Sequence, residues 1–191
     1  MGVAIAVQTL TAIAVTVALW RHAFVDRAMG WALRLGMAIA VAGASVGGLM
    51  TQPTRAQLES ARVTHEMPRA GAHSVGGLDG GPGLPGTGWS TEHGDLRVPH
   101  FVGLHAVQVL PLLAVLLARR LPDAARVRAV VGAGVIYAAL FLNLLGQPLL
   151  APQGPVLGAL AFLALGSAAF ALGTWRTSAT GLARHTAPEG A

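Results

Sequence analysis

The feature that most constrains the fold of this 191-residue chain is a series of long apolar blocks. They lie at about residues 2–20, 31–50, 101–118, 129–147 and 156–175. A soluble fold of this size divides its apolar residues into amphipathic stripes, whereas each block is almost free of charged side chains. An α-helix of about 20 such residues crosses the hydrocarbon core of a bilayer. The sequence therefore predicts an all-α integral membrane bundle of about five transmembrane helices, forming a single membrane domain in the lipid bilayer.

Composition supports a membrane protein and argues against a nucleic-acid-binding one. Hydrophobic residues make up 53% of the chain, charged residues make up 11%, and the mean hydropathy is +0.59. The net charge of +5 results from 13 arginines and 8 acidic residues, and lysine is absent. Most arginines flank the apolar blocks instead of forming one basic patch, so we expect no nucleic-acid partner. Cysteine is absent, which excludes disulfides and cysteine-ligated metal sites.

The arginines also predict an orientation. They are concentrated between the first two blocks, between the third and fourth blocks, and in the tail at 176–191. A five-helix path places these segments on one side, and the positive-inside rule makes that side the cytoplasm of a bacterial inner membrane. The long connection at 51–99 and the N-terminus would then lie outside. Because Met1 is followed directly by apolar residues, we expect it to be an internal methionine of a longer parent.

The long outer connection divides into two parts. Residues 53–68 predict a short polar helix, with Thr54 as a cap ahead of Gln57. Residues 71–88 hold so many glycines and prolines that only turns are expected. A flexible spacer is the simpler interpretation of this second part, although His73, Asp79 and Trp89 are unusual in a plain linker.

Polar side chains in the outer halves of three blocks indicate a candidate pocket. His105 and Gln108 are about 60° apart on one helix face, and Asn143 and Gln147 share a face of the fourth block. The first block brings Gln8 to a similar depth. Unpaired polar groups cost several kcal/mol in hydrocarbon, so these residues should face one another or a wet cavity. They predict a ligand-binding pocket formed by the first, third and fourth blocks, lidded by the Gly/Pro-rich loop.

The same histidines leave a metal or haem site open. His73, His93, His100 and His105 lie on or near the outer side and are the candidate metal ligands, with Glu92 or Asp95 as further donors. His100 lies about 140° from His105 and should point elsewhere. A b-type haem would need a second axial histidine from the loop. No metal-binding motif supports either site, so we expect no cofactor and assign no catalytic residue.

The stretch HSVGGLDGGPGLPGTGWSTEHGDLRVPHFVGLHAVQVLPLL resembles a segment of uncharacterised polytopic membrane proteins of bacteria with GC-rich genomes. The likeness rests on a DLRxPHFxGLHAxQxLPLL-like helix after a Gly/Pro-rich loop. It implies a longer parent with further helices before Met1, and it transfers no activity and no binding residue.

Three functions stay open on sequence alone. The first is a permease-like or sensor module that binds a small ligand or metal in the outer polar pocket. The second is a structural or assembly subunit, in which the same amides only join helices within a homo-oligomer or to partner subunits. The third is a haem- or metal-dependent membrane redox protein.

Overall fold

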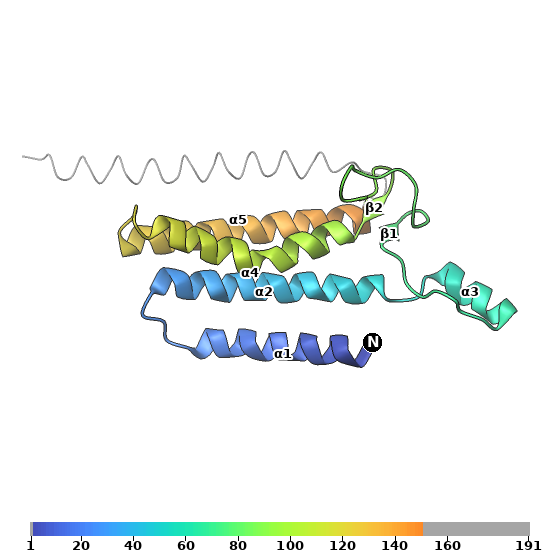
Figure 1. Ribbon diagram of the computed structural model, residues 1–191, viewed down its shortest axis with the longest axis horizontal. Coiled ribbons are helices and arrows are strands. Elements are labelled where there is room, and N and C mark those ends of the chain that lie inside the picture. Colours follow the sequence, from blue (N-terminus) through green and yellow to red (C-terminus); the bar gives the residue numbers. More distant parts are fainter. Residues whose placement is uncertain (1, 151–191) are drawn as a thin grey trace, which may run out of the picture.

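The computed structural model describes residues 2–150 and is mostly helical (Figure 1). Within this range, four helices are long and apolar enough to cross a membrane. They are α1 (Gly2–Arg21), α2 (Arg27–Met50), α4 (Arg97–Leu117) and α5 (Asp123–Leu150). The first four predicted blocks are therefore confirmed as helices. The fifth block at 156–175 and the tail at 176–191 lie outside the described residues.

The helices extend further than the apolar blocks that predicted them. α2 begins at Arg27, because the Asp26 carboxylate caps it by accepting a hydrogen bond from the Met29 backbone N–H at 2.9 Å. α4 begins at Arg97, and α5 runs from Asp123 to Leu150. Helical hydrogen bonding continues into the polar ends, which a boundary drawn on hydropathy alone misses.

The core of the bundle is the close pair of α2 and α4. A Cβ added at Gly43 would lie 2.7 Å from the Gly103 Cα, and one added at Gly36 would lie 2.9 Å from the Ala106 carbonyl oxygen. Only small residues allow two helix backbones to approach this closely. α5 packs on both partners, and Gly134 receives the Leu35 side chain there.

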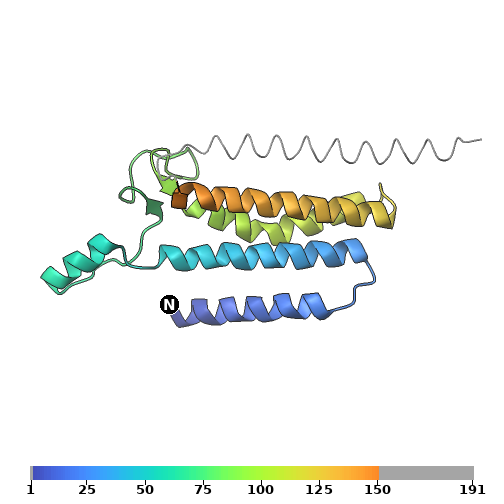
Figure 2. The same cartoon turned by 180° about the vertical axis from the view of Figure 1, so that it is seen from behind.

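Helix α1 packs chiefly on α2 and presents most of its apolar side chains outward. Figures 1 and 2 show it on the side of α2 away from α5. Arg34 of α2 binds the C-terminal end of α1. Its Nε donates to the Leu19 carbonyl at 3.0 Å, and the guanidinium also donates to the His22 carbonyl at 2.7 Å. These bonds satisfy carbonyl groups that a helix terminus leaves free.

The connection between α2 and α4 is built from α3 (Arg55–Thr64) and a two-stranded ladder of β1 (Ser74–Val75) and β2 (Gly94–Asp95). The predicted capping box is confirmed: Thr54 Oγ1 accepts from the Gln57 backbone N–H at 3.2 Å, and Gln57 Oε1 accepts from the Thr54 backbone N–H at 2.9 Å.

The expectation that residues 71–88 contain only turns is wrong at β1. The Asp79 carboxylate accepts hydrogen bonds from the backbone N–H groups of His73 and Ser74, which holds the following turn against this strand. β1 then pairs with β2, which follows the Gly/Pro-rich stretch in sequence. Gly94 of β2 also lies against Pro148, where an added Cβ would be 2.5 Å from the Pro148 Cα. The loop is therefore fixed to the end of α5.

The connections lie at two opposite ends of the bundle. The loop that holds α3, β1 and β2 lies at the same end as the start of α1 (Figure 1). The short connections from α1 to α2 and from α4 to α5, which carry the flanking arginines, lie together at the other end. The first two arginine-rich segments thus share one end, as the sequence predicted.

Candidate ligand cavity between α1, α2 and α4

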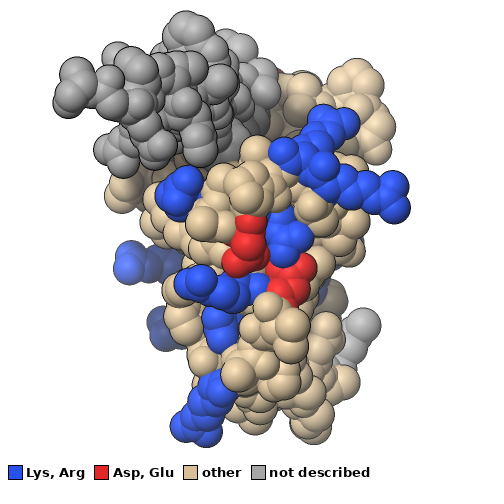
Figure 3. Space-filling model, turned by 90° about the vertical axis from the view of Figure 1, so that its left-hand side faces the viewer, with Lys and Arg blue, Asp and Glu red and all other residues tan. Residues whose placement is uncertain are grey.

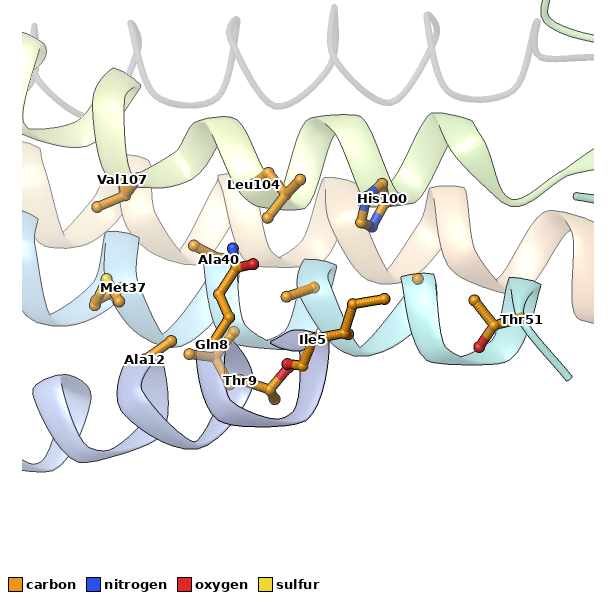
Figure 4. Close-up of a pocket in the computed structure, with 13 residues that line it drawn as sticks. Ile5, Gln8, Thr9, Ala12, Met37, Ala40, Thr51, His100, Leu104 and Val107 are labelled. Atoms are coloured by element: carbon orange, nitrogen blue, oxygen red, sulfur yellow. The ribbon is translucent and has the colours of Figure 1, made fainter. Parts of the chain in front are cut away.

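A cavity of about 510 Å³ opens between α1, α2 and α4, towards the end of the bundle that carries the long loop (Figure 4). Its walls are mainly apolar. They include Ile5, Ala12, Met37, Val41, Leu104 and Val107. The polar groups come from Gln8 and Thr9 of α1, Thr51 after α2, and His100 of α4.

Two of these polar groups already have partners within their own segments. Thr9 Oγ1 donates to the Ile5 carbonyl at 2.9 Å, and Thr51 Oγ1 donates to the Gly48 carbonyl at 2.9 Å. No hydrogen bond joins the Gln8 side chain to another group in residues 2–150. Gln8 and His100 are therefore the side chains best placed to bind a polar group in the cavity.

His100 lies in the first turn of α4, and a contact with α2 determines which of its ring nitrogens carries the hydrogen. Its Nδ1 is 2.8 Å from the Gly43 carbonyl oxygen, which can only accept a hydrogen bond. In the neutral ring Nδ1 therefore carries the hydrogen, and Nε2 is left as an acceptor. Gly47, one turn after Gly43, makes room for the ring, since a Cβ there would lie 3.1 Å from His100 Cε1.

Helix α2 takes the place predicted for α5 in this cavity. Gln8 lines it as expected, but Asn143 and Gln147 do not. Instead Gln147 Nε2 donates to Asn143 Oδ1 at 3.3 Å along α5. The predicted pocket of the first, third and fourth blocks is thus corrected, because the α2–α4 pair places α2 next to α1 and moves α5 to the other side.

His105 and Gln108 also lie outside the cavity. His105 Nδ1 is 2.7 Å from the Phe101 carbonyl oxygen of the same helix, and the two rings stack with centroids 3.9 Å apart. Gln108 is exposed on the surface of α4. The predicted divergence of His100 from His105 is confirmed, since only His100 lines the cavity. A ligand-binding role for His105, Gln108, Asn143 and Gln147 stays a prediction.

A second, smaller cavity of about 20 Å³ lies beneath the loop, where Gln147 meets Ser90, His93 and Asp95. Asp95 is buried and binds Arg97 through two guanidinium contacts, Nε to Oδ1 at 3.0 Å and an Nη to Oδ2 at 2.6 Å. It also accepts from the Ser90 backbone N–H at 2.9 Å. Burial alone would raise the pKa of Asp95, but the hydrogen bonds from Arg97 and Ser90 outweigh it and hold the pKa below its ordinary value.

The four candidate metal ligands have different surroundings. His73 Nδ1 pairs with Asp79 at 3.0 Å, and the ring of His93 lies against Gly77 with its Nδ1 buried and without a hydrogen-bond partner in the described part of the chain. His100 and His105 make the separate contacts given above. Within residues 2–150, no three His, Asp or Glu side chains are grouped so that they could hold a metal ion. The described residues therefore do not assemble the metal site that the sequence left open.

Sequence reasoning missed the contribution of α2, which supplies much of the cavity wall. The only available signal was the spacing of small residues along this helix, which places Gly36, Ala40, Gly43 and Gly47 towards α4.

Comparison with known proteins adds no relative: no family model, curated protein or solved structure matches the chain.

Proposed function

We propose that the chain is an integral membrane protein of a bacterial inner membrane. The support is the presence of four long apolar helices within residues 2–150, with seven of the eleven arginines of this range at one end and the hydrogen-bonded loop at the other. In this placement the arginine end is cytoplasmic and the loop is outside, as the positive-inside rule requires. The bacterial assignment is supported by the resemblance of the loop and α4 segment given above.

Within that membrane, the cavity between α1, α2 and α4 binds a small amphiphile with a hydroxyl or amide head group. Its volume of about 510 Å³ is in the usual range for small-molecule pockets. His100 lies about 5 Å below the start of α4, and Val107 lies about 10 Å deeper. The polar head would therefore bind near the membrane surface, while the apolar part extends along Met37, Leu104 and Val107 towards the bilayer centre.

The observation that carries this proposal is the contact between His100 and Gly43. Because Nδ1 is committed to the Gly43 carbonyl, Nε2 can accept a hydrogen bond from a ligand hydroxyl or amide. The Gln8 amide can both donate and accept, so it offers a second polar contact on the α1 wall of the same cavity. A permease-like or sensor module would use this site for recognition.

The test is photolabelling of the reconstituted protein with a long-chain alcohol that carries a diazirine in its apolar tail. We expect labelled residues on Met37, Leu104 or Val107, and labelling that an excess of unmodified alcohol prevents. His100→Leu should weaken labelling about fivefold, the usual value of one neutral hydrogen bond.

His105→Leu is the matched control, since His105 lies on the same helix outside the cavity. It should label like the unmodified chain. Labelling that is spread evenly over the lipid-facing residues, or equal loss in both variants, would contradict the proposed site.

A second candidate function, assembly with another helix, is favoured by Gln108. Its amide is exposed on α4 beside Val109 and Leu112, and no hydrogen bond joins it to another group in the described part of the chain. Amides on lipid-facing surfaces join transmembrane helices. Gln108→Leu should then lower the oligomeric mass measured in detergent by light scattering, and an unchanged mass would remove this candidate.

A further inference from the structure

The end of the bundle opposite the long loop is strongly basic. Figure 3 views this end and shows arginines spread across it around two central acidic residues. The arginines are Arg21, Arg27, Arg34, Arg119, Arg120, Arg126 and Arg128, and the acidic residues are Asp26 and Asp123. The arginines come from the last turn of α1, the first two turns of α2 and of α5, and the connection after α4.

Two of these arginines are already bound within the protein. Arg126 pairs with both Asp26 and Asp123, so it accounts for both carboxylates, and its side chain is only 12% exposed. Arg34 donates to carbonyl groups at the end of α1, and its guanidinium lies 5.3 Å from the centre of the Phe24 ring. These contacts hold the helices together at this end and leave neither residue free for a partner.

The other five arginines are exposed and form no ion pair with another residue of the described chain. Each lies within about two turns of an apolar helix segment, which places its guanidinium at the depth of lipid head groups. Trp20 and Trp31 pack edge to face at the same end, with centroids 5.9 Å apart, as is usual for side chains at a membrane interface.

We propose that this arginine end binds the phosphate groups of acidic phospholipids. A guanidinium binds a phosphate through two parallel hydrogen bonds, and each basic side chain near the surface favours an acidic lipid by about fivefold. Arg119 and Arg120, adjacent after α4, offer the densest pair of free guanidinium groups. The inference rests on the membrane placement proposed above.

The experiment measures the lipids in contact with the full chain reconstituted in phosphatidylcholine vesicles. Spin-labelled phosphatidylglycerol and spin-labelled phosphatidylcholine are compared by electron paramagnetic resonance. We expect the acidic lipid to be enriched at the protein, and the enrichment to fall at least about fivefold in the double variant Arg119→Gln, Arg120→Gln. High salt should reduce the enrichment of the unmodified chain.

The matched control removes the same charge at the other end through Arg55→Gln and Arg62→Gln, both exposed on α3. This control should keep the full enrichment. Equal association of the two lipids with the unmodified chain, or equal loss in the two double variants, would overturn the proposal. Flotation with the phosphatidylcholine vesicles separates a loss of lipid preference from a failure to insert. A chain that has not inserted does not float with the vesicles, whereas an inserted chain without lipid preference does.

Discussion

The Nδ1 atom of His100 lies 2.8 Å from the carbonyl oxygen of Gly43, at the close backbone contact between α2 and α4. The same contact lies within the packing of α2 against α4 and determines which nitrogen of His100 is available in the cavity. Glycine at position 43 lets the α4 backbone approach, and the same residue orients the imidazole ring. Packing and ligand binding therefore depend on one local arrangement, and substitutions near it should separate the two.

The first prediction concerns the α2–α4 contact. Gly43→Ala should destabilise the bundle, because the new methyl group would lie 2.7 Å from the backbone of Gly103. Overpacking of this kind costs about 1–3 kcal/mol. Unfolding in detergent, followed by circular dichroism, measures the loss. Gly48→Ala is the control, since an added Cβ there meets no described residue within 4 Å. Equal stability of the two variants would contradict this account of the packing.

The second prediction concerns the attachment of α1. Arg34→Gln should loosen the end of α1, since it removes the charged hydrogen bonds to the carbonyls of Leu19 and His22. Hydrogen bonds to charged groups contribute about 1.5–3 kcal/mol. Amide hydrogen exchange along residues 16–26 should rise in this variant. Arg27→Gln, an exposed arginine nearby, should leave the exchange unchanged. A rise in both variants would indicate a general charge effect.

The third prediction is a pH dependence of the loop. The native pKa of Asp95 is below its ordinary value of 3.8, so its ionised form stabilises the folded loop. That contribution is complete above about pH 4, the ordinary pKa of a carboxyl group, and is lost as the pH falls through the lower native pKa. The protection of the Ser90 and Arg97 amides, measured against the intrinsic exchange rate at each pH, should therefore fall at acidic pH.

Two variants test whether Asp95 causes this pH dependence. Asp95→Asn should show fast exchange at Ser90 already at neutral pH, because the carboxylate contact with Arg97 is lost. The pKa of Asp79 is also lowered: burial raises it, but backbone hydrogen bonds from Ser74 and His73 outweigh burial. Asp79→Asn should act on β1 and leave Ser90 protected. A protection factor at Ser90 that stays the same from pH 7 to pH values well below 3.8 would refute the assignment.

Much of the fold could be predicted from the sequence, because hydropathy and local capping act within single segments. The apolar blocks identified α1, α2, α4 and α5, and the spacing of Thr54 and Gln57 identified the start of α3. The arginine pattern also placed the two short connections at one end. These inferences need no knowledge of which helix lies beside which.

The candidate site was less predictable because it depends on helix neighbours. Helical spacing correctly separated His100 from His105, but it could not show which of the two lines a cavity. The position of α2 between α1 and α4 follows from backbone contacts at Gly36 and Gly43, which become visible only when both helices are placed. Likewise, the hydrogen bonds of Asp79 that shape the Gly/Pro-rich loop join residues that the turn signals alone do not connect.

The most direct test of the membrane placement uses the absence of cysteine from the chain. Single cysteines are introduced at Thr87, exposed in the loop, and at Ala124, exposed near the start of α5. Intact bacterial cells that express each variant are treated with a membrane-impermeant maleimide. The account predicts labelling of Thr87→Cys in intact cells and of Ala124→Cys only after the cells are opened. Equal labelling of both positions in intact cells, or recovery of the chain in the soluble fraction, would contradict it.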